Sequence, residues 1–159
     1  MKSSVLFVCL GNICRSPTAE AVFRAQLKAA GLIETISVDS AGTGDWHIGK
    51  APDHRAQTAG AERGFDLSRL RARLVTKEDF SQYQWIIAMD ENNYRDLQQL
   101  SPPQYQHKIS LLLDFAQKKI AHRNVPDPYY GSMADFHHVV DLVEDACQGL
   151  LAHIQRELS

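Results

Sequence analysis

Residues 5–17 of this chain read Val5-Leu6-Phe7-Val8-Cys9-Leu10-Gly11-Asn12-Ile13-Cys14-Arg15-Ser16-Pro17. The apolar run 5–8 is typical of a strand that is buried on both faces of a parallel sheet. A short turn with glycine and asparagine follows Cys9. Ser16-Pro17 then predicts a helix start, with serine at the N-cap and proline at the first helical position. The stretch therefore predicts a strand, a loop and a helix N-terminus in direct succession.

This succession suits the binding of a doubly charged oxyanion next to a thiolate. Backbone N–H groups of a curled loop and the positive end of a helix dipole form an anion site. The same groups favour the thiolate, which is the reactive form of a cysteine. Arg15, six residues after Cys9, can bind two phosphate oxygens with its planar guanidinium. The simpler alternative is that Cys9 only fills space at the end of a buried strand, as free cysteines often do.

Composition and charge favour a single globular domain over residues 1–159. The chain is 44% hydrophobic and 23% charged, which is usual for such a protein. Its net charge of −2 gives no broad basic field, so we expect neither a nucleic acid nor a membrane as partner. No apolar run approaches the ~18 residues that span a bilayer. The first residues do not resemble a signal peptide, and we expect a cytoplasmic location.

The number and spacing of the cysteines and histidines argue against a metal site and against a disulfide framework. Three cysteines cannot all pair, and none forms a C-x-x-C motif, which favours a reducing compartment. The adjacent His137 and His138 would point roughly 100° apart on a helix and not toward one metal. We therefore expect no metal.

The pattern of the whole chain predicts an α/β fold. Short apolar runs alternate with segments of helical periodicity, and glycine or proline residues separate them. We predict strands at 5–8, 35–40, 85–89 and 109–113, and helices at 17–30, 52–62, 91–100 and 133–156. Strands separated by helices imply right-handed βαβ units and a parallel sheet that is covered on both faces. Ligands of such sheets bind beyond the carboxyl ends of the strands, where Cys9 lies.

A second candidate group is Asp127, in the sequence Pro126-Asp127-Pro128-Tyr129-Tyr130. The two prolines hold the aspartate in an extended, rigid loop. A carboxylate fixed in this way suits a general acid, which would protonate the oxygen that leaves a phosphate ester. Asp-Pro is also common in ordinary turns. The two tyrosines favour the catalytic interpretation, because they could form the walls of a slot for an aryl group.

Motifs at both ends of the chain resemble the low-molecular-weight protein tyrosine phosphatases. The likeness includes residues 9–17 and 127–130, and extends through the segments 39–43, 76–80 and 88–90. It implies a single-domain, three-layer α/β/α fold with a four-stranded parallel sheet and a phosphate-binding loop after the first strand. It also implies a phosphomonoesterase that needs no cofactor and acts as a monomer on phosphotyrosine-containing proteins.

The resemblance implies roles for individual residues. Cys9 would form a phosphocysteine, and Asp127 would be the acid and then the base. Arg15 and loop N–H groups would bind the phosphoryl oxygens, and Ser16 would donate a hydrogen bond to Cys9. The implied phosphate-binding group is Leu10, Gly11, Asn12, Ile13, Cys14 and Ser16. Ser40 would support the loop through Asn12, and the cleft walls would be Trp46, Tyr129 and Tyr130.

Cys14 resembles a second loop cysteine of the family, which can form a reversible disulfide with the nucleophile. Such a bond would protect Cys9 from irreversible oxidation. The alternative that Cys14 only packs under the loop is equally compatible with the sequence.

Three alternative functions stay open at this stage. Arsenate reduction on the same scaffold needs further cysteines around residues 80–90, and none is present there. Protein-arginine phosphatases resemble this loop but carry threonine where this chain has Ile13, and the larger side chain favours a phenol ring. A non-catalytic binding module is disfavoured, because nucleophile, arginine and acid are all present.

Overall fold

The computed structural model describes residues 3–158 of the chain. Its elements follow the order β1 (Ser3–Cys9), α1 (Arg15–Ala29), β2 (Ile36–Gly42), α2 (His54–Ala61), α3 (Lys77–Gln82), β3 (Trp85–Ala88), α4 (Glu91–Leu100), η1 (Pro103–Lys108), β4 (Ile109–Leu111), η2 (Leu112–Phe115) and α5 (Met133–Leu158). The strands form a parallel four-stranded sheet in the order β2-β1-β3-β4. This confirms the predicted sheet.

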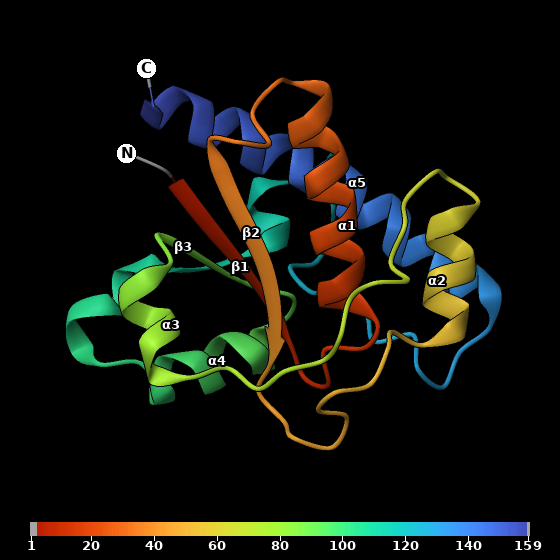
Figure 1. Cartoon of the computed structure of the whole chain (residues 1–159), viewed down its shortest axis with the longest axis horizontal. Coiled ribbons are helices and arrows are strands. Elements are labelled where there is room, and N and C mark those ends of the chain that lie inside the picture. The colour runs from red at the N-terminus through yellow and green to blue at the C-terminus, as the bar shows by residue number, and fades with distance from the viewer. Residues whose placement is uncertain (1–2, 159) are drawn as a thin grey trace.

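Helices cover both faces of the sheet, as the α/β/α prediction requires (Figure 1). Side chains alternate along β1, so Val5 and Phe7 pack on one face and Leu6 and Val8 on the other. The first face is covered by α1 and α5, and the second by α3 and α4. All four of these β1 side chains are fully buried. The central strand is therefore the middle of the core, and the residue at its carboxyl end has a fixed position.

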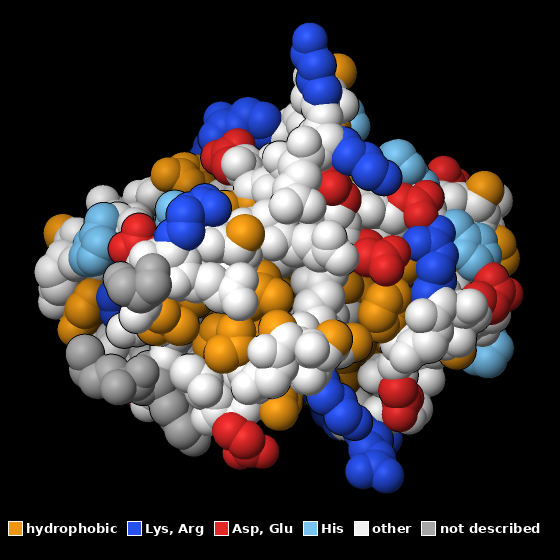
Figure 2. Space-filling model, turned by 90° about the horizontal axis from the view of Figure 1, so that it is seen from above, with side chains coloured by type: hydrophobic (Ala, Val, Ile, Leu, Met, Phe, Trp, Pro, Cys, Tyr) orange, Lys and Arg blue, Asp and Glu red, His pale blue; other side chains and the backbone are white. Residues whose placement is uncertain are grey.

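The carboxyl ends of β1, β2 and β3 lie at the same edge of the sheet, where Cys9 pairs with Gly42 (Figure 1). The amino ends lie at the opposite edge, with the chain termini. Figure 2 shows the molecule from that side, where Lys and Arg side chains are interspersed with Asp and Glu. Among residues 3–158, no helix has both the length and the apolar character needed to cross a bilayer.

Most predicted boundaries differ from the structure by one or two residues, and those near the carboxyl edge of the sheet matter most. Helix α1 begins at Arg15, two residues earlier than predicted, and its N-cap is Cys14 and not Ser16. The Ser16 side chain instead lies within 3.0 Å of the Cys9 sulfur, so it is not available to cap a backbone N–H. Strand β2 continues to Gly42, and β4 ends at Leu111, where the chain turns into η2.

Helix α3 and the two 3-10 helices, η1 and η2, were not predicted. The six-residue helix α3 is too short to show an apolar periodicity. It begins with a reciprocal capping box between Thr76 and Asp79, whose carboxylate accepts from the Thr76 N–H at 2.8 Å.

Helix α5 packs unusually closely on the chain at the end of η2, and this contact can be tested. A Cβ atom on Gly149 would lie 1.7 Å from the backbone carbonyl oxygen of Phe115. We expect Gly149→Ala to lower the free energy of unfolding by about 1–3 kcal/mol, because backbone cannot yield to the added methyl group. Denaturant unfolding measures this. Gln148→Ala, at the exposed neighbouring position, is the control and should stay within about 0.5 kcal/mol of wild type. Equal stability of both variants would contradict the close packing.

Candidate active site

The loop between β1 and α1, residues 9–15, curls back over the Cys9 side chain. Asn12 adopts a left-handed backbone conformation with φ 57°, which asparagine tolerates better than most residues. The turn brings the Asn12 N–H to 3.3 Å from the Cys9 sulfur. We call residues 9–15 the Cys-Arg loop.

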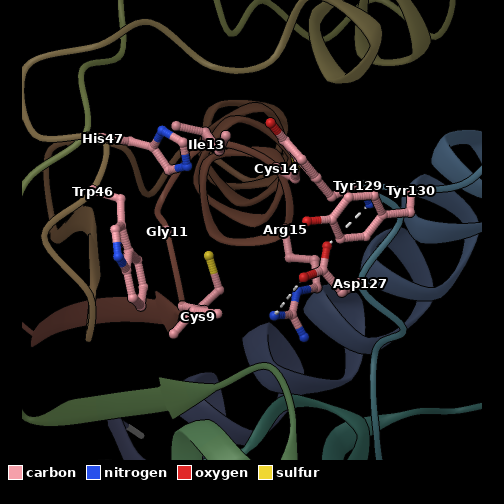
Figure 3. A pocket seen from close by; sticks show the side chains of 11 residues that line it. Cys9, Gly11, Ile13, Cys14, Arg15, Trp46, His47, Asp127, Tyr129 and Tyr130 are labelled. Carbon is pink, nitrogen blue, oxygen red and sulfur yellow. Dashed lines mark hydrogen bonds and ion pairs between the residues drawn. The ribbon is translucent and has the colours of Figure 1, made fainter.

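Cys9 lies at the floor of a cavity of about 350 Å³. Its sulfur points into this cavity, between Trp46 and His47 on one side and Asp127 and the tyrosines on the other (Figure 3). The residue is 3% exposed, so the thiol is reached only through the cavity. The Ser16 hydroxyl contacts the sulfur at 3.0 Å from behind.

Arg15 reaches the cavity from the first turn of α1 and is held by fixed partners. Its Nη1 donates to Asp90 Oδ2 at 2.5 Å and to the Val125 carbonyl at 3.0 Å. Burial disfavours the charged guanidinium, but Cys9, Asp90 and Asp127 outweigh burial and raise the pKa of Arg15. The arginine is therefore a permanent, oriented positive charge beside the thiol.

Asp127 comes from the loop between η2 and α5 and faces the same arginine. Its Oδ2 lies 3.8 Å from Arg15 Nη2, and its Oδ1 accepts from the Tyr129 N–H at 3.1 Å (Figure 3). The side chain is 48% exposed. A carboxyl group therefore stands at the open side of the cavity, while the thiol lies at its floor.

Aromatic side chains form the upper walls of the cavity. The Tyr129 and Tyr130 rings meet edge to face with centroids 5.0 Å apart. Trp46 is 65% exposed and Tyr130 is 96% exposed, so both rings are free to contact a ligand. Trp46 packs over Gly44, where a Cβ would meet the indole ring at 1.9 Å. Trp46, Tyr129 and Tyr130, the three predicted cleft-wall residues, all line this cavity.

The structure divides the predicted phosphate-binding group into two sets. Leu10, Gly11, Ile13 and Cys14 line the cavity. The Asn12 and Ser16 side chains do not line it and lie buried behind the loop.

Behind the loop, the predicted bond between Asn12 and Ser40 is present, with Asn12 Nδ2 donating to Ser40 Oγ at 3.0 Å. The same nitrogen donates to Ser16 Oγ at 2.8 Å. Cys14 both lines the cavity and packs among buried apolar residues, and burial raises the pKa of its thiol.

Two residues of the site were missed from the sequence: His47, which lines the cavity, and Asp90, which binds Arg15 but does not line the cavity. His47 packs so closely on the loop that a Cβ on Gly11 would lie 2.9 Å from its Cδ2 atom. Its position next to Trp46 is the signal that could have identified it. Asp90 is the N-cap of α4, where its Oδ1 accepts from the Asn93 N–H at 2.7 Å. Its other oxygen binds Arg15, and its place after a buried strand at the carboxyl edge could have indicated this.

Within residues 3–158, no group of three or more His, Cys, Asp or Glu side chains is arranged to hold a metal ion. The chemistry available in the cavity is that of a thiol, a guanidinium, a carboxyl group and the N–H groups of the loop.

A model of the low molecular weight phosphotyrosine protein phosphatase family matches residues 4–159. The chain belongs to this family. Among curated members, the Bacillus subtilis low molecular weight protein-tyrosine-phosphatase YfkJ is 42% identical over 97% of both chains. The human low molecular weight phosphotyrosine protein phosphatase is 44% identical over 93% of both chains.

Solved structures of phosphatases in this family have the same fold. The crystal structure of the Entamoeba histolytica protein tyrosine phosphatase with Hepes in its active site superimposes with a TM-score of 0.95, at 41% identity and over 99% of this chain and 100% of that one. The crystal structure of Bacillus subtilis YfkJ gives a TM-score of 0.93, at 41% identity and over 100% and 98% of the two chains. These relatives carry phosphatase names, which favours the tyrosine phosphatase prediction over the arginine phosphatase and arsenate reductase alternatives.

Proposed function

We propose that this member of the low molecular weight phosphatase family hydrolyses phosphotyrosine and related aryl phosphates through a phosphocysteine intermediate on Cys9. The observation that supports it most is the shared cavity, with the Cys9 sulfur at its floor, Arg15 beside it and Asp127 at its open side. The three groups supply a nucleophile, an anion-binding cation and a proton donor from three separate elements of the fold.

In the first step, the Cys9 thiolate attacks the phosphorus atom and the bond from phosphorus to the phenol oxygen breaks. Arg15 and the loop N–H groups bind the phosphoryl oxygens, whose charge they stabilise in the transition state. Asp127 gives its proton to the leaving oxygen. The products of this step are a free phenol, a phosphocysteine and an ionised Asp127.

In the second step, the Asp127 carboxylate takes a proton from a water molecule as that water attacks the phosphocysteine. The sulfur–phosphorus bond breaks and returns the electron pair to Cys9. Inorganic phosphate leaves, and the thiolate and the protonated Asp127 are restored. The cycle requires no metal or cofactor.

The walls of the cavity support an aryl substrate. Tyr129, Tyr130 and Trp46 offer ring faces and edges to a phenol ring, and Ile13 takes up space near the loop. We propose phosphotyrosine-containing proteins as the substrates of this protein, which acts as a monomer in the cytoplasm. The three free, buried cysteines suit a reducing compartment.

Substrate preference tests this proposal directly. We expect kcat/KM for a phosphotyrosine peptide to exceed that for phosphoarginine by at least about a hundredfold, which is within the range of discrimination by an apolar pocket contact. Phosphate release from both substrates measures the ratio. Ile13→Thr, which shortens the side chain at the loop, should lower the ratio of kcat/KM for the phosphotyrosine peptide to kcat/KM for phosphoarginine. Faster hydrolysis of phosphoarginine by the wild-type protein would overturn the assignment.

A further inference from the structure

Residues 128–131 carry two of the aromatic walls of the cavity and form a turn without regular secondary structure. We call these residues the tyrosine turn. The Gly131 N–H donates to the Pro128 carbonyl at 2.8 Å, and the Tyr129 N–H donates to the Asp127 carboxylate at 3.1 Å. These local bonds give the turn its shape, but they do not determine its distance from the Cys-Arg loop.

Arg55, on α2, connects the tyrosine turn to a different part of the fold. Its Nη2 donates to the Tyr129 carbonyl at 2.9 Å, and its Nη1 donates to the Gly131 carbonyl at 3.4 Å. The guanidinium carbon lies 5.6 Å from the centroid of the Tyr129 ring and 4.6 Å from that of the Phe136 ring. Among residues 3–158, no other side chain donates a hydrogen bond to the tyrosine turn.

The chain on either side of the turn has anchors of its own. The Val125 N–H donates to the Met89 carbonyl at 2.8 Å, and the Val125 carbonyl accepts from Arg15 at 3.0 Å. Together with the two prolines that flank Asp127, this anchor holds the carboxyl group without any help from Arg55. Downstream, α5 begins at Met133. The residue whose place depends on Arg55 is therefore Tyr129, between these anchors, and not Asp127.

Arg55 is itself attached to the Cys-Arg loop through Asp53. Its Nε donates to Asp53 Oδ1 at 3.1 Å and its Nη2 to Asp53 Oδ2 at 3.0 Å, and these bonds raise the pKa of Arg55. The Asp53 N–H donates to the Ile13 carbonyl at 2.8 Å. A continuous path of hydrogen bonds therefore joins Ile13 to Tyr129, and both of these residues line the cavity.

The position of Tyr129 matters because of what lies across the cavity. Tyr129 stands on the side opposite to Trp46, with the Cys9 sulfur between them (Figure 3). An aryl group bound above the sulfur would contact both rings, and such contacts require the rings to stand at a fixed separation. A turn that is free to move outward would lose its contact with the aryl group.

We propose that Arg55 is a positioning residue for aryl ligands, which holds the Tyr129 ring at a fixed distance from the Cys-Arg loop and so sets the width of the slot between Tyr129 and Trp46. Arg55 does not line the cavity and acts through Tyr129. The proposal rests on the proposed function, because it concerns the aryl part of that substrate.

A role in stability alone is the alternative, since Arg55 also joins α2 to Phe136 of α5. The N-cap of α2 does not distinguish the two roles. Asp53 Oδ1 accepts there from the backbone N–H of residue 55 at 2.9 Å, and this bond remains whatever side chain residue 55 carries. Ligand affinity distinguishes them, because a stability role does not select for an aryl group.

The test is Arg55→Met, which removes every donor and keeps an unbranched side chain. Calorimetric titration with benzylphosphonate and with inorganic phosphate is the readout. We expect affinity for benzylphosphonate to fall about three- to tenfold, the effect of losing one aromatic contact. Affinity for inorganic phosphate should stay at the wild-type value, because phosphate has no aryl group. Neither ligand is hydrolysed, so the result is independent of whether the protein turns over aryl phosphates.

A double-mutant cycle tests whether Arg55 acts through the Tyr129 ring. In a Tyr129→Ala background, Arg55→Met should cause no further loss of benzylphosphonate affinity, because the ring is already absent. Arg63→Met is the matched control. Arg63 follows α2 and pairs with Asp141 and Glu144 of α5, but it does not contact the tyrosine turn. We expect both affinities of this control to equal those of wild type.

Wild-type affinity of Arg55→Met for benzylphosphonate would overturn the proposal. An equal loss of affinity for both ligands would also overturn it, because that result indicates damage to the Cys-Arg loop. A further loss in the Tyr129→Ala background would show that Arg55 does not act through the ring. If Arg55→Met does not fold, Arg55→Lys decides, since a lysine cannot donate to two carbonyls and Asp53 with the planar geometry of arginine. It must show the same selective loss.

Discussion

Cys9→Ser is expected to abolish hydrolysis of p-nitrophenyl phosphate, with kcat lowered by at least about four orders of magnitude. A serine hydroxyl stays protonated where a thiol can ionise, and the Asp127 carboxyl group stands at the open side of the cavity and not beside residue 9. The donors that would bind the phosphoryl group, Arg15 and the loop N–H groups, are unchanged by the substitution. The variant should therefore still bind inorganic phosphate.

Steady-state kinetics and calorimetric titration with inorganic phosphate separate these two effects. Cys147→Ala is the control for loss of a thiol, because Cys147 is fully buried in α5 and lies outside the cavity. It should keep its turnover. Rapid turnover by Cys9→Ser would show that another group attacks the phosphate, and loss of both turnover and phosphate binding would indicate a damaged loop.

Asp127→Asn is expected to lower kcat by about 10²–10⁴-fold, the usual contribution of a general acid or base. Asparagine has nearly the same shape and can still accept from the Tyr129 N–H, so the loop should keep its conformation. It cannot give a proton to the leaving oxygen or take one from water. The loss should be larger for phenyl phosphate than for p-nitrophenyl phosphate, because the nitrophenolate leaves more easily without protonation.

Kinetics with the two esters measure this difference. Asp114→Asn is the matched control, because Asp114 is an exposed carboxylate that pairs with Arg123 at 2.8 Å and does not line the cavity. We expect it to behave like wild type. If Asp127→Asn loses the same factor with both esters, Asp127 does not protonate the leaving group.

The fold was predictable because its signals are local. Residues 5–8 of β1 and 85–88 of β3 are all apolar, which is typical of buried strands. The residues after β3 contain a clear N-cap, Asp90. The predicted helix 91–100 has the bounds found in the structure. The prediction of the last strand failed at its end, because the local signal there is ambiguous. Leu112 and Leu113 continue an apolar run, yet they turn into η2, since burial alone does not distinguish a strand from a short helix.

The site was predictable where one short segment holds several functional groups. The Cys-Arg loop contains both the proposed nucleophile and the arginine within seven residues. The prolines on either side of Asp127 indicate that its carboxylate is held in a rigid loop. Asp90 contacts the Cys-Arg loop from another element, and 75 residues separate it from Arg15. Such contacts depend on how the sheet brings its strand ends together, which no local pattern encodes. Ser16 shows the same limit, because its hydroxyl can cap a helix or face a sulfur, and only the folded loop distinguishes the two.

In the proposed mechanism, Cys9 carries the phosphoryl group during turnover. The most direct measurement mixes the protein with a phosphotyrosine peptide, stops the reaction with acid during turnover, and maps phosphate by fragment-ion mass spectrometry. With p-nitrophenyl phosphate as substrate, Asp127→Asn should accumulate the intermediate, because the nitrophenolate leaves without an acid while the attack of water lacks its base. We predict phosphate on Cys9, and none on any residue of Cys9→Ser. Phosphate on another side chain, or release of phosphate by Cys9→Ser at the wild-type rate, would contradict the mechanism.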